Sequence, residues 1–157
     1  MYAGVTMGII YLTGMMGSGK TVVARLVAEQ CARTMIDIDE RIIDREGASI
    51  SEIFAKKGEP YFRRIEKEIL QDISRRDNCV VATGGGVVLD PANIACMQKS
   101  GVIIYLKAPT DVLYMRLKDK KDRPLLKVQN PEDRLKEILK ARSGFYEKAD
   151  YAVDTAG

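Results

Sequence analysis

The sequence predicts a three-layer α/β domain in which helices cover both faces of a parallel sheet. Short apolar runs alternate along the chain with longer amphipathic stretches, the arrangement typical of parallel strands joined by helices. A glycine-rich motif directly follows the first apolar run and precedes the first amphipathic stretch. The 157 residues suffice for one domain with a sizeable core, and no repeat or linker divides them.

Each element of this domain has its own signal in the sequence. The apolar runs predict five short strands, at residues 8–13, 34–38, 79–83, 102–106 and 151–154. The amphipathic stretches predict helices at residues 20–32, from a capping box at Ser49 and Glu52, and at 59–75, 91–99, 109–117 and 130–146. In the first helix we expect one apolar face, made by Val23, Ala24, Leu26 and Val27.

The composition excludes several classes of site. The chain has no histidine, so a histidine general base and a histidine-ligated metal are both excluded. Its three cysteines, Cys31, Cys79 and Cys96, are too few for a four-thiolate zinc site, and their odd number argues against a disulfide framework. A net charge of +3 does not indicate a protein that binds nucleic acid or a membrane surface. Any catalysis must therefore use carboxylates, lysine, arginine, backbone amides or an oxygen-liganded metal.

The compartment follows from the same features. No run approaches the roughly 20 apolar residues that span a bilayer. The first 12 residues are mildly apolar, but they lack a cationic start and a cleavage site and lead straight into the glycine motif. We therefore expect a first strand in place of a signal peptide, with Met7 as an alternative start, and a cytoplasmic protein.

The glycine motif carries the strongest chemical signal. It reads Gly14-Met15-Met16-Gly17-Ser18-Gly19-Lys20-Thr21 and fits the phosphate-binding loop, with a strand before it and a helix after it. Glycines let successive amides face an anion, and the helix start adds its positive dipole end. Lys20 is expected to reach the β- and γ-phosphates, and the Thr21 hydroxyl to bind magnesium. A glycine-rich turn that matches by chance is the alternative.

Asp37 and Asp39 close the second predicted strand. Residues two apart in a strand point to the same side, so both carboxylates are expected at the carboxyl end of the sheet, where ligands bind. One of them could hold magnesium through water, while the other accepts a hydrogen bond or proton from a substrate hydroxyl. The alternative is that Asp39 only caps the next helix. Beside a phosphate loop we favour the functional interpretation.

Two arginines stand out on the predicted helices. Arg142 falls in the middle of the apolar stripe of residues 130–146, where a buried cation needs an anionic partner. In residues 59–75, Arg63 borders the buried face and Glu66 lies within it, whereas Arg64 points to solvent. We therefore select Arg63, with Glu66 orienting it. A structural salt bridge is the alternative for both arginines.

Two further segments are weaker signals. Gly84-Gly85-Gly86 follows the third strand and suggests a close approach of the backbone to a ligand. Residues 116–127 hold six basic and two acidic residues between two helices. They fit a lid that brings Arg123 over transferring phosphates, although a solvated basic loop is the commoner meaning of such a run.

In order along the chain, these motifs resemble the shikimate kinase family of the nucleoside-monophosphate-kinase-like P-loop proteins. Gly14–Thr21 resembles its Walker A loop, and Asp37-Ile38-Asp39 its Asp-x-Asp motif. Gly58-Glu59-x-x-Phe62-Arg63-x-x-Glu66 is similar to the family's substrate helix, and Gly84–Gly86 to its glycine triplet. Arg123-Pro124-Leu125-Leu126 is similar to its lid, and Arg142-x-x-x-Tyr146 to its last substrate motif.

The resemblance implies an α/β/α P-loop kinase fold with a five-stranded parallel sheet. It also implies ATP-dependent phosphorylation of the shikimate 3-hydroxyl in aromatic amino-acid biosynthesis. Asp39, Arg63, the glycines Gly84, Gly85 and Gly86, and Arg142 would hold shikimate, with Lys20, Asp39 and Arg123 catalytic. ATP would contact Gly14, Gly17, Ser18, Gly19, Lys20, Thr21, Val22, Arg116 and Arg123, and Mg²⁺ would contact Thr21 and, through water, Asp37.

The remaining expectations concern organisation and partners. We expect one domain over residues 1–157, with substrate-binding helices at about 39–76 and a lid at about 116–130. Family members continue past Val153-Asp154-Thr155 with an adenine-contacting loop and a final helix, so that helix is expected to be missing. A monomer that binds neither nucleic acid nor a membrane is expected. The rival functions are a kinase for gluconate or a nucleotide, and a nucleotide-binding regulator without turnover.

Overall fold

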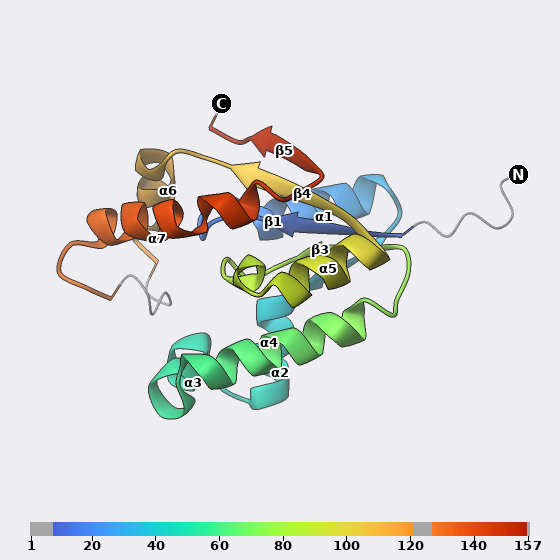
Figure 1. Cartoon of the computed structure of the whole chain (residues 1–157), viewed down its shortest axis with the longest axis horizontal. Helices are drawn as coiled ribbons and strands as arrows, with labels where there is room; N and C mark the ends of the chain where they lie inside the picture. The colour runs from blue at the N-terminus through green and yellow to red at the C-terminus, as the bar shows by residue number, and fades with distance from the viewer. Residues whose placement is uncertain (1–7, 121–126, 157) are drawn as a thin grey trace, which may run out of the picture.

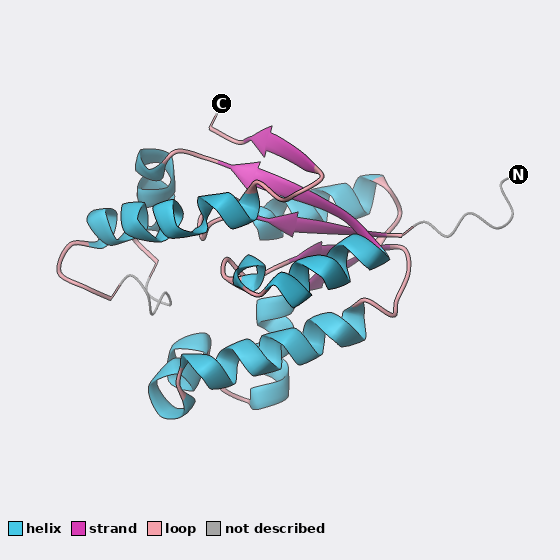
Figure 2. Ribbon diagram, viewed as in Figure 1, coloured by secondary structure: helices cyan, strands magenta, loops and turns pink. Residues whose placement is uncertain are grey.

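The computed structural model describes residues 8–120 and 127–156 and contains the predicted five-stranded sheet. All neighbouring strands are parallel, in the order β2-β3-β1-β4-β5, and the arrows in Figure 2 run the same way. The strands are β1 (Ile9–Thr13), β2 (Thr34–Asp37), β3 (Cys79–Ala82), β4 (Gly101–Lys107) and β5 (Tyr151–Asp154). The parallel α/β architecture predicted from the alternation of elements is therefore confirmed.

Helices connect the strands, and all of them were predicted with similar bounds except the helix at residues 38–46 and a short turn at 87–89, which were not predicted. They are α1 (Lys20–Gln30), α2 (Ile38–Glu46), α3 (Ile50–Lys57), α4 (Glu59–Ile73), α5 (Pro91–Ser100), α6 (Thr110–Leu117) and α7 (Pro131–Tyr146), with a short 3₁₀ turn η1 (Val87–Leu89). Ser49 caps α3 as predicted, since its hydroxyl accepts from the Glu52 N–H at 3.2 Å. Asn130 occupies the N-cap position of α7, but its side chain forms no hydrogen bond there.

The core lies on both faces of the sheet. Alternate strand residues divide between the faces: Tyr11 and Tyr105 belong to the cluster that includes residues of α4, α5, α6 and α7, whereas Leu12 and Leu106 pack with α1. Figure 1 shows α5 and α7 in front of the strands and α1 behind them. The helices of these two clusters, with the sheet between them, form the three layers. Within α1 one prediction is wrong, because Ala24 and Ala28 face the sheet and leave Leu26 53% exposed.

Strand register brings the chemical motifs to one edge of the sheet. Leu12 of β1 and Asp37 of β2 both pair with Ala82 of β3, so the segments that leave these three strands lie side by side. Those segments are the glycine-rich loop, the start of α2 and the glycine triplet. The helices α2, α3 and α4 pack against one another below the sheet in Figure 1. No helix within residues 8–120 and 127–156 is long and apolar enough to cross a membrane.

Candidate active site

The glycine-rich loop between β1 and α1 has the form of an anion cradle. Gly14 adopts a φ of +146°, and a Cβ there would lie 2.6 Å from the Leu106 carbonyl oxygen, so only glycine fits. Within the described chain, the N–H groups of Gly17, Gly19 and Thr21 donate to no protein acceptor. The loop thus presents backbone donors at the start of an 11-residue helix, whose dipole favours an anion.

Lys20 and Ser18 complete this loop. The Lys20 ammonium donates to the Gly14 and Met15 carbonyl oxygens at 2.6 and 3.0 Å, which folds its side chain back over the loop. The Ser18 hydroxyl oxygen is buried and lacks a hydrogen-bond partner among the described residues. A buried polar atom without a partner costs free energy unless a ligand or water satisfies it. The residues present therefore fit a bound phosphate chain.

Asp37 joins the loop to α2. Its Oδ2 accepts from the Thr21 hydroxyl at 2.7 Å, and its Oδ1 accepts from the Glu40 N–H at 3.2 Å as the N-cap of α2. The expectation that Asp37 and Asp39 share a strand is wrong, because the strand ends at Asp37 and Asp39 lies in the first turn of the helix. Both carboxylates nevertheless line the same cavity.

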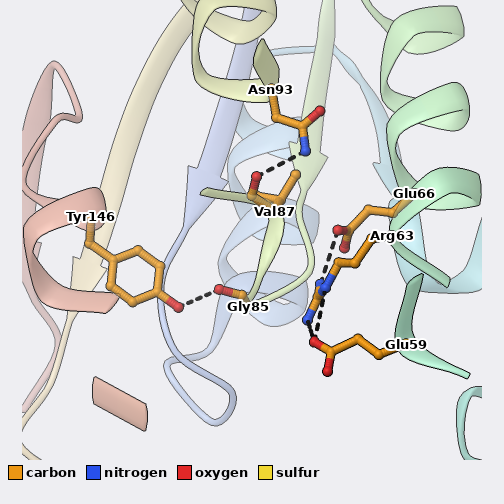
Figure 3. A network of polar contacts seen from close by, with 7 residues as sticks. All are labelled: Glu59, Arg63, Glu66, Gly85, Val87, Asn93 and Tyr146. Carbon is orange, nitrogen blue, oxygen red and sulfur yellow. Dashed lines mark hydrogen bonds and ion pairs between the residues drawn. The ribbon is translucent and has the colours of Figure 1, made fainter. Parts of the chain in front are cut away.

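Arg63 forms an ion-pair network on α4, drawn in Figure 3. Its guanidinium donates to Glu66 Oε1 at 3.0 Å and to Glu59 Oε1 at 3.2 Å. Glu66 is completely buried, and burial raises the pKa of its carboxyl, which the nearby Arg63 charge opposes. Its Oε2 has no partner among the described residues. Arg64 is exposed, as the periodicity of the helix predicted, and lies over the Tyr61 ring.

Arg142 lies inside the molecule on α7, as its place in the apolar stripe predicted. It is only 5% exposed, and its Nη1 lies 3.3 Å from the position that a Cβ on Gly85 would occupy. Its guanidinium forms no ion pair with any carboxylate of the described chain. A buried cation in this situation favours an anion brought by a ligand.

The glycine triplet completes the wall between these two arginines. A Cβ on Gly84 would lie 2.6 Å from Glu66 Oε2 and 3.3 Å from Asp39 Oδ1, and one on Gly86 would lie 2.5 Å from Arg63 Cζ. The loop therefore approaches all of these side chains closely. A side chain at Gly84 or Gly86 would therefore push Glu66 or Arg63 out of its present position.

One cavity of about 350 Å³ brings most of the predicted residues together. It is lined by Gly17, Gly19, Lys20, Thr21, Val22, Asp37, Asp39, Arg63, Gly84, Gly85, Gly86, Arg116 and Arg142. Two predicted loop residues, Gly14 and Ser18, do not line it. Arg123 lies outside the described residues. The volume falls at the lower end of the range for small-molecule sites.

The cavity also has residues that sequence reasoning did not select as site residues. Phe54 and Phe62 line it with ring centroids 4.8 Å apart, and Lys120 adds a charge from the basic segment. The periodicity of α3 and α4 marks these phenylalanines as apolar, but the same signal marks ordinary core residues. Arg116 donates to the Gly17 carbonyl oxygen at 3.2 Å and to that of Thr155 at 2.7 Å, so it links the glycine-rich loop to the segment after β5.

The oxygen atoms beside the loop suit a hard cation. The described chain contains no group of three or more metal-binding His, Cys, Asp or Glu side chains. The adjacent Thr21 hydroxyl and Asp37 carboxylate instead supply two oxygens next to the phosphate cradle. Mg²⁺ is commonly bound in this way, by one or two protein oxygens together with substrate phosphates and water.

Comparisons with known proteins agree with this geometry. A family model described as shikimate kinase matches residues 16–157. The shikimate kinases of Thermodesulfovibrio yellowstonii and Caldanaerobacter subterraneus are 49% and 48% identical, each alignment covering 94% of this chain and 86% of the relative. The shikimate kinase from Acinetobacter baumannii, solved in complex with shikimate, has a TM-score of 0.94 at 40% identity over 97% of this chain and 86% of that one.

A more distant likeness bears on the rival functions. A gluconokinase from Sinorhizobium meliloti shares 20% identity with a TM-score of 0.57, which shows a common fold alone. The shikimate kinase family model covers nearly the whole chain, and the two bacterial shikimate kinases are more than 40% identical to this chain. The chain therefore belongs to the shikimate kinase family.

Proposed function

We propose that this protein transfers the γ-phosphoryl group of ATP to the 3-hydroxyl of shikimate. The observation that carries the proposal is the buried guanidinium of Arg142, which has no carboxylate partner in the described chain and lines the same cavity as the phosphate-binding loop. An anionic acceptor substrate supplies the missing negative charge beside the phosphate site. Membership of the shikimate kinase family and the shikimate complex of the Acinetobacter baumannii relative support this acceptor.

Arg63 and Arg142 hold the shikimate carboxylate in this proposal. They approach the glycine triplet from α4 and α7, and two guanidinium groups give a bidentate, charge-assisted site for one carboxylate. Glu66 and Glu59 hold Arg63 in place through its ion pairs. Because Glu66 is fully buried and hydrogen-bonded to Arg63, it restricts the arginine to one orientation. Gly84, Gly85 and Gly86 form the wall along which the ring lies.

Asp39 orients the attacking hydroxyl. Its carboxylate lies next to Gly84 and lines the same cavity as Arg63, Arg142 and the phosphate-binding loop. From there it accepts the hydrogen bond of the hydroxyl and takes up its proton as the hydroxyl oxygen bonds to the γ-phosphorus, while the bond from that phosphorus to the β–γ bridging oxygen breaks and ADP leaves. In this mechanism positioning and electrostatic stabilisation supply most of the catalysis.

The phosphate side of the cavity stabilises the transferring group. The unpaired amides of the loop and the positive end of α1 bind the phosphates of ATP, Lys20 neutralises charge on them, and Ser18 and Val22 belong to the same cradle. Arg123 is assigned here on the family resemblance, as the cation of a lid at about residues 116–130 that closes over the transferring phosphoryl. Arg116, which contacts Gly17 and Thr155, is assigned to the adenine side.

Thr21 and Asp37 would hold the magnesium ion. The hydroxyl of Thr21 would contact the ion directly and the carboxylate of Asp37 would contact it through water, which their mutual hydrogen bond beside the loop supports. When bound, Mg²⁺ neutralises developing charge on the phosphate oxygens. Asp37 also caps α2, so the same carboxylate keeps the helix that carries Asp39 in register with the loop.

An assay of ADP release tests the proposal. The protein is mixed with Mg²⁺-ATP and, separately, shikimate, gluconate, a nucleoside monophosphate or no acceptor. We expect ADP release that depends on shikimate and falls to background with the other acceptors. Equal turnover with gluconate or the nucleotide would contradict the assigned acceptor. Nucleotide binding without turnover on any acceptor would support a regulatory domain instead.

The organisation of the chain completes the proposal. We assign one catalytic domain, acting as a monomer in the cytoplasm without nucleic-acid or membrane partners, with its substrate-binding helices at about residues 39–76. The packing of α2, α3 and α4 beside the cavity supports the assignment of residues 39–76 to substrate binding. Light scattering of the purified protein with and without ATP checks the monomer, since a mass of twice 17.5 kDa would contradict it.

A further inference from the structure

The loop that carries the glycine triplet is held from behind by two buried side chains. The Tyr146 hydroxyl of α7 donates to the Gly85 carbonyl oxygen, and Asn93 of α5 donates from Nδ2 to the Val87 carbonyl oxygen at 3.0 Å. Figure 3 shows these two contacts together with the Arg63 network. Neither Tyr146 nor Asn93 lines the candidate cavity, so both act on the loop from the protein side.

The contact at Gly85 fixes which way the amide of Gly86 points. The described chain contains no cis peptide, and in a trans peptide the carbonyl oxygen and the following N–H point in opposite directions. Because Tyr146 holds the Gly85 carbonyl toward the buried side, the N–H of Gly86 is directed away from it. The N–H groups of Gly84, Gly85 and Gly86 donate to no acceptor in the described chain. The loop therefore keeps free donors at the cavity wall.

Tyr146 is well suited to hold a peptide in place. Its ring is 1% exposed and stacks on Tyr105, with centroids 4.9 Å apart and an interplanar angle of 13°. Burial raises the pKa of its phenol to about 12, so the hydroxyl keeps its proton and remains a donor at neutral pH. Arg142 lies one helical turn earlier on the same helix. A shift of α7 would thus move the acid-binding guanidinium and the loop together.

We infer that Tyr146 is a positioning residue for the acceptor substrate: its hydroxyl holds the Gly85 carbonyl so that the amide of Gly86 faces the bound acid. This inference rests on the proposed function and adds a residue to that site. Tyr146 acts through Gly85, and also through Arg142, with which its hydroxyl interacts, and does not touch the reacting atoms. Its loss should therefore loosen binding of the acceptor. The phosphate-binding loop lies close to Gly85, since a Cβ there would be 3.5 Å from Met16 N, but it is also held by the Lys20 contacts with Gly14 and Met15, so we expect it to keep its form.

The test is the Tyr146→Phe variant, with Tyr105→Phe as a matched control. Both substitutions remove one hydroxyl from the same stacked pair of rings, but only the first removes the hydrogen bond to Gly85. For Tyr146→Phe we expect the KM for shikimate to rise about tenfold, with kcat and the KM for ATP within about twofold of the parent. For Tyr105→Phe we expect all three values to stay within about twofold.

Two kinetic outcomes would overturn the inference. An unchanged KM for shikimate in Tyr146→Phe would show that the hydroxyl does not position the loop. A parallel rise in the KM for shikimate and ATP in that variant would show a general loss of structure.

A second measurement keeps the inference separate from the proposed function. In ¹⁵N-labelled protein, the amide resonances of Gly85 and Gly86 should shift in Tyr146→Phe and stay in place in Tyr105→Phe. This result is independent of turnover, so it decides the role of Tyr146 even if shikimate proves not to be the substrate. Unmoved glycine resonances in Tyr146→Phe would overturn the inference.

Discussion

Replacing Gly86 by alanine should displace Arg63 without unfolding the protein. Gly86 has a φ of −97°, which alanine adopts without strain. The added methyl group would lie 2.5 Å from Arg63 Cζ and closer still to both terminal nitrogens, whereas ordinary contact is about 3.5–4 Å. The guanidinium must therefore retreat by about 1 Å, and it can do so because it lies at the end of a flexible side chain.

The size of the effect follows from what this retreat breaks. The guanidinium is held by Glu66 Oε1 at 3.0 Å and by Glu59 Oε1 at 3.2 Å, so a shift of about 1 Å removes at least one charge-assisted hydrogen bond. Such a bond contributes about 1.5–3 kcal/mol. A misplacement of about 1 Å in a substrate-positioning group costs about 100-fold in rate. We therefore expect kcat/KM for shikimate to fall by about 100-fold, with the KM for ATP within about twofold.

The measurement is steady-state kinetics with each substrate varied in turn, together with thermal unfolding. Gly144→Ala is the matched control, because it makes the same change on α7, where an added Cβ meets no atom within 4 Å. This control should keep full activity and gain slightly in stability, as glycine is unfavourable in a helix interior. If Gly86→Ala keeps its kcat/KM for shikimate, or loses affinity for ATP to the same extent, the reasoning about Arg63 is wrong.

Three further changes test other parts of the site and its frame. Arg142→Ala should weaken shikimate binding about 100-fold or more in calorimetry and leave ATP binding nearly unchanged, because it removes a buried cation opposite the acid; equal losses for both ligands would contradict this. Glu66→Gln should change the pH dependence of stability in urea unfolding. The pKa of Glu66 in the folded protein lies above its usual 4.5, so ionisation of this carboxyl opposes folding. The parent should therefore lose stability relative to the variant as pH rises from 4.5 through that raised pKa. A stability difference that does not change with pH would refute the raised pKa of Glu66. Asp90→Ala should cost about 1 kcal/mol of stability without changing kinetics, because its carboxylate caps α5 by accepting from the Ala92 N–H; a large kinetic effect would argue against a purely structural role.

The sequence predicted the elements of the site best where one periodicity decided the outcome. On α4 and α7 the 3.6-residue repeat placed Arg63 beside the buried face, Arg64 in solvent and Arg142 inside, and the structure agrees. The parallel order of strands followed from the alternation of apolar and amphipathic segments, which leaves few topologies for a chain of this length.

Prediction failed where two distant segments determine local structure. Asp37 ends β2 and caps α2, and its carboxylate also accepts from Thr21, 16 residues earlier. Asp39, two residues further on, therefore lies in a helix instead of the strand. The bond from Tyr146 to Gly85 joins residues 61 positions apart, and no spacing rule reveals it. On α1 the small side chains of Ala24 and Ala28 face the sheet, which turned Leu26 outward.

Phosphorus NMR of the reaction mixture tests the central claim most directly. The protein is incubated with ATP, Mg²⁺ and shikimate, and the products are followed by their ³¹P resonances. We expect a new phosphomonoester resonance, coupled to the proton on carbon 3 of shikimate, that grows in step with ADP. The Asp39→Asn variant should form it far more slowly. ADP accompanied only by inorganic phosphate, or a phosphomonoester on another hydroxyl, would contradict the account.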